Sequence, residues 1–280
     1  MKNISVKLFS FLFVIASIFQ SCDSDDEVVE IIDDNSDVAN ELEVAALDSE
    51  LVIEWTDLLL ELERYASGRP NGSARALAYI YLAAYETAVP GMTDRISNSE
   101  RLDGLTINNE EQPTNINWEI ALNSCLSKVL DHFLLNLTSD LNASISAFEA
   151  STEGALSIDL SETLVDDSKA WGEYVANQVI AYSQTDVEAE TQVLDPQPLS
   201  YEPPVGEGFW TYSADPERAL FPYWESARTF VISPEETTSK EPIDYSEQEG
   251  SKYYDQMMEV YEVNNSAREE DGEQLWIAEF

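Results

Sequence analysis

"SARALAYIYLAAYETAV", residues Ser73–Val89, is the stretch that most strongly favours one fold class. Its apolar side chains recur every three or four residues, the spacing of one face of an α-helix. That face comprises Ala74, Leu77, Ala78, Tyr81, Leu82, Tyr85 and Ala88. We expect Ser73 to cap the start of the helix and Pro90-Gly91 to end it. The many small alanines predict close approach of other helices, so the expected fold class is all-α.

The same periodicity predicts helices on both sides of this segment. They cover Leu51–Ala66, Asn117–Leu137, Leu141–Ala150 and Ser161–Thr185, and a last pair follows Tyr245. In the two longest of these helices, the faces expected to be buried consist of Leu122, Cys125, Leu126, Val129, Leu130, Phe133 and Leu137, and of Leu164, Ser168, Trp171, Val175, Val179 and Tyr182.

Residues 193–233 have a different composition, rich in proline, glycine and aromatic residues. Disordered loops rarely carry so many aromatic side chains. We therefore expect a long ordered loop, rich in Pro and aromatic residues, over a partial helical bundle.

The N-terminal residues have the pattern of an export signal. Lys2 and Lys7 precede the apolar run Leu8–Phe19, which is shorter than the ~20 residues of a membrane-spanning helix. Ser21-Cys22 resembles the lipobox of bacterial lipoproteins, in which the cysteine is acylated. We expect residues 1–21 to be a lipoprotein signal peptide and Cys22 to be lipidated; an ordinary signal peptide that contains a cysteine is the alternative.

Residues 22–50 are acidic, and no Lys or Arg occurs between Lys7 and Arg64. Such a segment cannot bury enough apolar surface to fold, which predicts a solvated tether. An acidic stretch after the lipid-bearing cysteine also resembles the surface-export signal of Bacteroidota lipoproteins. We therefore expect an exported protein, anchored by lipid to the bacterial outer membrane, whose folded domain covers residues 51–280.

Charge and cysteine content exclude some classes of function. The formal net charge is −41 over 280 residues, which opposes binding to nucleic acid and favours cations or cationic partners. Only Cys22 and Cys125 are present, so a disulfide framework is not expected. Cys125 is predicted to be a small core residue.

Three passages carry a family resemblance. They are "RPNGSARALAYIYLAAYETAVPG" (Arg69–Gly91), the segment Tyr201–Ser233 and "EEDGEQLWIAEF" (Glu269–Phe280). In this order they are similar to vanadium-dependent haloperoxidases, whose fold is shared with the type-2 phosphatidic acid phosphatases. The residues that match in the first two passages are Pro70, Ala74, Arg75, Ala78, Tyr85, Glu86, Pro203, Pro204, Gly206, Gly208, Trp210, Pro222, Trp224, Arg228, Thr229 and Phe230; Glu225 departs from the family's glycine.

The resemblance implies a site that this chain lacks. In the family, vanadate or phosphate is bound by Lys-x6-Arg-Pro, by Ser-Gly-His and by a further His. Here Leu62 stands where the first motif has lysine, Arg69 follows Ser67-Gly68, and His132 is the single histidine. We therefore expect the C-terminal catalytic half to be absent from residues 51–280. No catalytic, cofactor-binding or metal-binding residue is assigned, and vanadate is expected only in an intact family member.

The remaining candidates have structural roles. Arg75 and Arg228 are expected to be buried ion-pair partners that hold helix to loop, with Glu86 as one of their partners. The resemblance implies that Trp210 and Trp224 help to frame a pocket. His132 is expected to be a polar position on an amphipathic helix.

Acidic pairs such as Asp166-Asp167 favour a solvated face over a Ca²⁺ site, because none has EF-hand spacing.

Two interpretations of the whole chain remain open. On the family resemblance, the chain is expected to be the non-catalytic part of a haloperoxidase-like protein, with a catalytic half or an oligomer as its partner. Alternatively, the aromatic loop is a ligand surface, and the chain is a surface-anchored helical binding protein without enzymatic activity.

Overall fold

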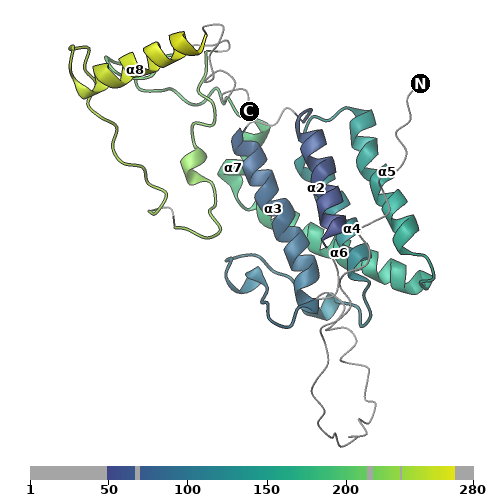
Figure 1. The fold of residues 1–280 in the computed structure, drawn as a ribbon. Helices are drawn as coiled ribbons and strands as arrows, with labels where there is room; N and C mark the ends of the chain where they lie inside the picture. The colour runs from purple at the N-terminus through teal and green to yellow at the C-terminus, as the bar shows by residue number, and fades with distance from the viewer. Residues whose placement is uncertain (1–48, 67–69, 213–216, 234, 269–280) are drawn as a thin grey trace, which may run out of the picture. The chain divides into compact units, whose positions relative to one another are not determined.

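A computed structural model of the chain describes residues 49–66, 70–212, 217–233 and 235–268 (Figure 1). Within these ranges the regular elements are all helical, which confirms the all-α prediction. The export signal, Cys22, nearly all of the tether and the passage Glu269–Phe280 lie outside the described residues. None of the described helices combines the length and the apolar character that crossing a membrane requires.

Five helices form the bundle (Figure 1). They are α2 (Glu50–Glu63), α3 (Pro70–Ala88), α4 (Trp118–Phe133), α5 (Ser139–Leu156) and α6 (Glu162–Gln184). Helices α3, α4 and α6 pack on one another, and α2 and α5 pack on α4.

Two more helices and four short turns complete the described chain. Two further helices, α7 (Val187–Leu194) and α8 (Lys252–Ala267), follow the bundle in sequence. The connections contain the short 3₁₀ turns η1 (Val89–Gly91), η2 (Asn98–Glu100), η3 (Asn109–Glu111) and η4 (Trp224–Ser226).

Polar side chains cap most of the long helices. The side chains of Asn117, Thr138, Ser161 and Ser251 accept hydrogen bonds from backbone N–H groups in the first turns of α4, α5, α6 and α8. These N–H groups have no partner within the helix, so each cap stabilises its helix by roughly 1 kcal/mol. The sequence thus fixes where these four helices begin.

Helix α3 begins earlier than predicted. It starts at Pro70, a residue whose fixed φ suits the first turn of a helix. Ser73 therefore lies inside the helix, where its hydroxyl donates a hydrogen bond to the Glu63 carboxylate of α2. The predicted capping role of Ser73 was wrong, because the pattern of apolar residues starts one turn after the helix does.

The main core lies between α2, α3, α4 and α6. Trp55 of α2 is buried, its indole Nε1 donates to Asn123 Oδ1 at 3.0 Å, and its ring packs edge-on against Phe148 of α5. The Asn123 amide in turn donates to the carbonyl oxygen of Glu149, so one side chain links three helices. The buried members of the faces predicted for α4 and α6 are Cys125, Leu126, Val129, Leu130, Ser168, Trp171, Val175, Val179 and Tyr182, which confirms those faces.

The apolar face predicted for α3 is buried only in part, at Leu82 and Ala88, with Leu77 packed against the core. Ala74, Ala78 and Tyr81 are exposed. The buried side chains are Arg75, Ala76, Tyr79, Ile80, Leu82, Ala83, Ala84, Glu86, Thr87 and Ala88. Polar residues reach the interior because each has a partner there, and a pattern based on hydrophobicity places such residues outside.

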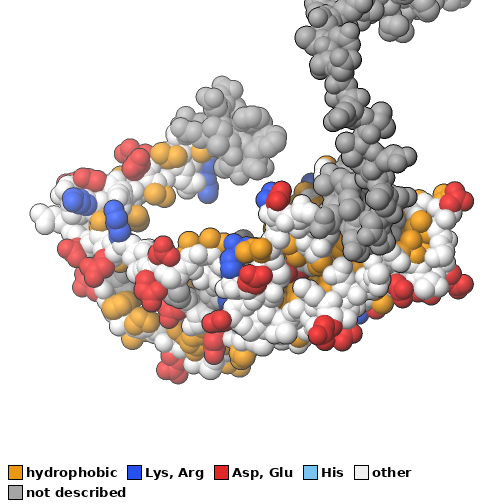
Figure 2. Space-filling view, turned by 90° about the horizontal axis from the view of Figure 1, so that it is seen from below, with side chains coloured by type: hydrophobic (Ala, Val, Ile, Leu, Met, Phe, Trp, Pro, Cys, Tyr) orange, Lys and Arg blue, Asp and Glu red, His pale blue; other side chains and the backbone are white. Residues whose placement is uncertain are grey.

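Acidic side chains are the most numerous charged groups on the face of the molecule drawn in Figure 2. Figure 2 shows Asp and Glu side chains spread over this face of the molecule, with few Lys and Arg side chains among them. Asp166 and Asp167 are both exposed, as expected for a solvated acidic face. No group of three or more His, Cys, Asp or Glu residues able to hold a metal occurs in the described part of the chain.

The contact between α4 and α6 requires glycine at one position. A Cβ atom on Gly172 of α6 would lie 2.0 Å from the backbone oxygen of Ala121 in α4. The position of this Cβ atom is set by the backbone of α6, and the oxygen belongs to the backbone of α4. Neither can move aside without separating the two helices. Gly154 of α5 offers a contrast, since a Cβ atom there would meet nothing within 4 Å.

We predict that Gly172→Ala lowers the free energy of unfolding by about 3 kcal/mol, at the upper end of typical overpacking costs. Gly154→Ala, the matched control on an exposed helix position, should raise it by about 0.5–1 kcal/mol, because alanine is the better helix former. Urea denaturation followed by far-ultraviolet circular dichroism measures both values. Equal stability of the two variants would contradict the observed helix contact.

Candidate functional site

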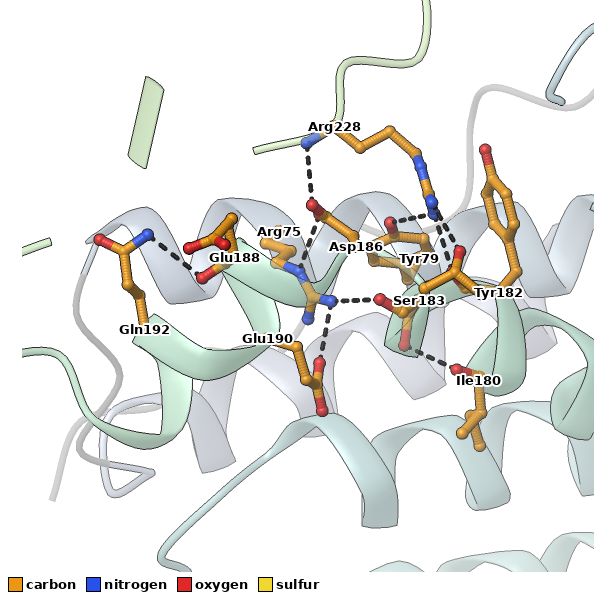
Figure 3. A network of polar contacts seen from close by, with 11 residues as sticks. Arg75, Tyr79, Ile180, Tyr182, Ser183, Asp186, Glu188, Glu190, Gln192 and Arg228 are labelled. Atoms are coloured by element: carbon orange, nitrogen blue, oxygen red, sulfur yellow. Dashed lines mark hydrogen bonds and ion pairs between the residues drawn. The ribbon is translucent and has the colours of Figure 1, made fainter. Parts of the chain in front are cut away.

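A network of polar contacts joins α3, the end of α6, α7 and the long loop (Figure 3). We call the described loop residues 195–212 and 217–233 the strap. Figure 3 shows Arg75 and Arg228 on either side of Asp186, which lies between α6 and α7. This network is the candidate functional site, because it brings together both arginines that the sequence singles out.

Arg75 is a buried cation compensated by two carboxylates. Its Nη2 lies 2.9 Å from Glu190 Oε2, and its Nε lies 3.6 Å from Asp186 Oδ2. Nη2 also donates to the backbone oxygen of Ser183 at 2.8 Å. The Arg75 and Asp186 side chains are only 7% and 6% exposed, so each charge depends on the other for compensation.

Arg228 attaches the strap to the bundle. Its Nη1 donates to the backbone oxygen of Tyr182 at 2.8 Å and to Tyr79 Oη at 3.2 Å, and its Nη2 donates to Thr185 Oγ1 at 2.6 Å. The guanidinium carbon lies 4.0 Å from the centre of the Tyr182 ring, a cation–π distance. The backbone N–H of Arg228 donates to Asp186 Oδ1 at 3.2 Å, so Asp186 serves both arginines.

Aromatic packing surrounds the two arginines. The Tyr79 ring stacks on Phe133 of α4 and meets Phe230 of the strap edge-on, with ring centres 5.7 and 5.0 Å apart. Burial raises the pKa of Tyr79, and the nearby Arg228 opposes this rise. Tyr79 therefore stays neutral as a packing residue and a hydrogen-bond acceptor.

A second attachment fixes the strap next to α7. The backbone N–H of Tyr223 donates to Oε1 of the buried Gln192 at 2.8 Å, and Gln192 Nε2 donates to the Glu188 backbone oxygen. The N–H of Phe221 donates to the Pro196 backbone oxygen at 2.8 Å, which brings two distant points of the strap together. The buried Phe221 ring thus ends a loop that starts at Pro196.

Glu86 is not part of this network. Its carboxylate is buried and accepts hydrogen bonds from Ser97 Oγ and from the backbone N–H of Asn98, at 2.7 Å for the latter. Glu86 therefore stabilises the start of turn η2 and pairs with neither Arg75 nor Arg228. The predicted ion pair between Glu86 and an arginine was wrong, because Asp186 and Glu190 occupy that role.

The two tryptophans lie in different surroundings. Trp210 is half exposed and packs edge-on against Tyr212, whereas Trp224 packs against Phe221. One cleft, of about 520 Å³, lies at the start of α6 beside Pro113, and another, of about 220 Å³, lies beside Glu86. Neither cleft is lined by Trp210 or Trp224, and their pocket-framing role stays a prediction.

His132 and Cys125 lie in the bundle. His132 is half buried against Phe133, and burial lowers its pKa although Glu190 acts in the opposite direction. Cys125 is fully buried, which raises the pKa of its thiol to about 12. A neutral imidazole and a protonated thiol fit the structural roles expected for both residues.

The network does not fit an oxyanion such as vanadate. Arg75 is already neutralised by Asp186 and Glu190, and the guanidinium of Arg228 donates to oxygens of the bundle. An oxyanion site needs uncompensated cations, and the family site also needs histidines, of which the chain has one. The arrangement can hold the strap in place, and we derive no catalytic step from it.

Comparisons with protein-family models, with curated proteins and with solved structures found no match to this chain. Arg75 and Arg228 lie at the junction of helix and loop, as predicted, and Arg75 forms ion pairs there. The prediction that Arg228 is a buried ion-pair partner was wrong, because it is only partly buried and its guanidinium binds uncharged oxygens among the described residues. Helix α7 and the roles of Asp186, Glu190 and Gln192 were not predicted. The sequence does contain a pattern that predicts α7. Asp186 precedes "VEAETQVL", whose first turn is acidic, and acidic residues stabilise the start of a helix.

We predict that Arg75→Met lowers the free energy of unfolding by about 3–5 kcal/mol, because Asp186 and Glu190 are left without their cation. The double variant with Asp186→Asn should regain part of this loss, since the amide oxygen can still accept the Arg228 N–H. Urea denaturation of both variants gives the values.

Lys169→Met is the matched control for this comparison. It removes an ion pair to Glu153 whose side chains are 32% and 27% exposed. Its loss should cost about 1 kcal/mol or less. Similar losses for Arg75→Met and Lys169→Met would show that the buried network contributes no more to the free energy of unfolding than a partly exposed ion pair does.

We predict that Arg228→Gln releases the strap while the bundle stays folded. The variant loses its charge-assisted hydrogen bonds and its contact with Tyr182, so limited proteolysis within the strap should accelerate by about tenfold or more. Arg218→Gln, an exposed charge change in the same strap, should leave the cleavage rate unchanged. Equal cleavage rates for the two variants would rule out Arg228 as the attachment.

Proposed function

We propose that residues 51–280 are the N-terminal, non-catalytic part of a vanadium-dependent haloperoxidase-like lipoprotein, with a helical bundle of that family's type. In this proposal the bundle and the strap form a scaffold beside which a catalytic half is positioned. Intact relatives oxidise halide with hydrogen peroxide at bound vanadate or hydrolyse phosphate esters. This chain does neither on its own, since it lacks the residues for the oxyanion site.

One observation carries the proposal. The first two passages on which the resemblance rests lie 110 or more residues apart in sequence, from Arg69–Gly91 to Tyr201–Ser233, yet they meet through the contacts of Arg228 and Phe230 with Tyr79. Two segments that belong to one scaffold are expected to pack on each other, and these two do. Their contact supports a shared scaffold and leaves the chemistry to residues that this chain does not contain.

Export and lipid anchoring belong to the same proposal. The apolar run Leu8–Phe19, the Ser21-Cys22 pair and the acidic residues that follow support a lipid anchor at Cys22 on the outer membrane. The acidic tether would then separate the anchor from the bundle, because like charges keep such a segment extended.

A second candidate function is a helical binding protein without a catalytic half. It is favoured by the exposed aromatic side chains of the strap, among which Phe209 and Trp210 are 54% and 53% exposed. Half-exposed aromatic rings are typical of interaction surfaces. The two candidates differ in what the gene encodes beside this chain.

We predict that purified residues 22–280 show no vanadate-dependent oxidation of bromide by hydrogen peroxide and no hydrolysis of a phosphate monoester. The expected rate equals that of buffer containing vanadate, because Arg75 is neutralised and the chain has a single histidine. Bromination of a dye measures the rate, and an established vanadium-dependent haloperoxidase provides the positive control. A rate that rises with added vanadate would contradict the proposal.

Sequencing the coding DNA beyond the codon for Phe280 separates the two candidate functions. If the chain is part of a scaffold, we expect the motifs Lys-x6-Arg-Pro and Ser-Gly-His to be encoded further along the same reading frame, after a single frameshift, or in an adjacent gene. If neither position encodes these motifs, the scaffold proposal fails and the binding protein becomes the better account.

A further inference from the structure

Helix α8 carries an unpartnered apolar face. Its apolar side chains recur at helical spacing over one half of its circumference and are Tyr253, Tyr254, Met257, Met258, Val260 and Tyr261. None of the residues of α8 is buried, and Met257, Val260 and Tyr261 are 45%, 62% and 61% exposed. An amphipathic helix gains little stability in water unless something covers such a face.

The polar side of α8 is acidic. At helical spacing, Asp255 and Glu262 lie beside the Met258 edge of the apolar face and Glu259 lies opposite the face, while Lys252 is in the first turn and Arg268 is at the C-cap. Helices that lie on membranes carry Lys and Arg on their polar side, so this charge pattern disfavours a lipid surface. The net charge of −41 likewise opposes pairing with a second copy of the chain.

The apolar face of α8 continues onto the strap through Tyr245. The Tyr245 ring packs against Tyr253 with ring centres 5.0 Å apart. Its side chain also covers Gly208, where an added Cβ atom would lie 2.8 Å from the Tyr245 ring. Gly208 has a φ of +81°, a second reason for glycine there, and the half-exposed Phe209 and Trp210 follow it. We call Tyr245 and the six apolar residues of α8 the aromatic face.

We propose that the aromatic face binds a basic amphipathic helix of another protein. Methionine and tyrosine side chains adapt to different apolar partners, and helices that bind such surfaces do so through apolar residues at steps of three and four. Asp255 and Glu262 of α8 border the face, so Lys and Arg on the flanks of the incoming helix would find complementary charge. This inference does not depend on the proposed scaffold function.

The test uses two synthetic peptides, each about 20 residues long and therefore able to form a helix of five to six turns. Both carry leucines at the same helical spacing; one has lysine and the other glutamate at the flanking positions. Fluorescence anisotropy with purified residues 22–280 measures binding of each peptide. We expect saturable binding of the lysine peptide that weakens with added salt, and no binding of the glutamate peptide.

Matched variants localise the binding. Met257→Gln combined with Val260→Gln removes apolar surface from α8 without changing charge, and should weaken binding of the lysine peptide by about tenfold. Ile53→Gln combined with Leu60→Gln makes the same type of change on α2, at residues 55% and 54% exposed, and should leave binding unchanged. Circular dichroism confirms that both variants keep their helices.

Three results would overturn the inference. They are failure of the lysine peptide to bind, equal binding by the two double variants, and equal binding of the lysine and glutamate peptides. Sedimentation of the unmodified chain and flotation with zwitterionic vesicles test the other occupants. Self-association or vesicle binding that disappears in the Met257→Gln, Val260→Gln variant would assign the face to a second copy or to a lipid surface, and would refute the basic-helix partner.

Discussion

The buried charge of Arg75 is the constraint on which the arrangement of the strap depends. A cation in the interior of a helical bundle is tolerated only with nearby carboxylates, and Asp186 and Glu190 supply them from the turn before α7 and from α7 itself. Asp186 accepts the backbone N–H of Arg228 as well. One carboxylate therefore fixes both the direction of α7 and the path of the strap, which within the described residues has no sheet partner of its own.

The sequence predicted those parts of the fold in which hydrophobicity and burial agree. Helices α4 and α6 have apolar faces that are also the buried faces, and their capping residues precede them. For helix α3, the predicted apolar face is rotated about the helix axis from the face that is buried. Arg75, Glu86 and Thr87 are buried and have polar partners, while Ala78 and Tyr81 are exposed. Hydrophobic periodicity reports which residues are apolar, and it cannot report which polar residues have found a partner inside.

The same limit applies to the candidate site. Arg75 was identifiable as a buried ion-pair residue, but its partners among 55 acidic residues were not. The same prediction was wrong for Arg228, whose guanidinium is bound among the described residues by hydroxyl and backbone oxygens and not by a carboxylate. The carboxylates that pair with Arg75 lie at the start of α7 and within it, and the pattern of this eight-residue helix is too short to distinguish from the loop after it. The network that joins the two resembling passages also neutralises the charge that an oxyanion would need. In the described structure both arginines hold the strap, α7 and the bundle together.

The strap contacts residues that lie far from it in sequence, and this separation affects the order of folding. Trp55 and Asn123 are 68 positions apart, whereas Tyr79 and Arg228 are 149 positions apart. Bringing the second pair together closes a longer loop of chain, which costs more entropy and slows formation of the contact. During synthesis, α2 to α6 emerge before Arg228 does, and these helices contain the residues of their own core. We therefore expect the Arg228 contacts to form after those of the bundle. Asp186 and Glu190, which compensate the charge of Arg75, precede the strap in the chain, so this charge is compensated whether or not the strap has docked.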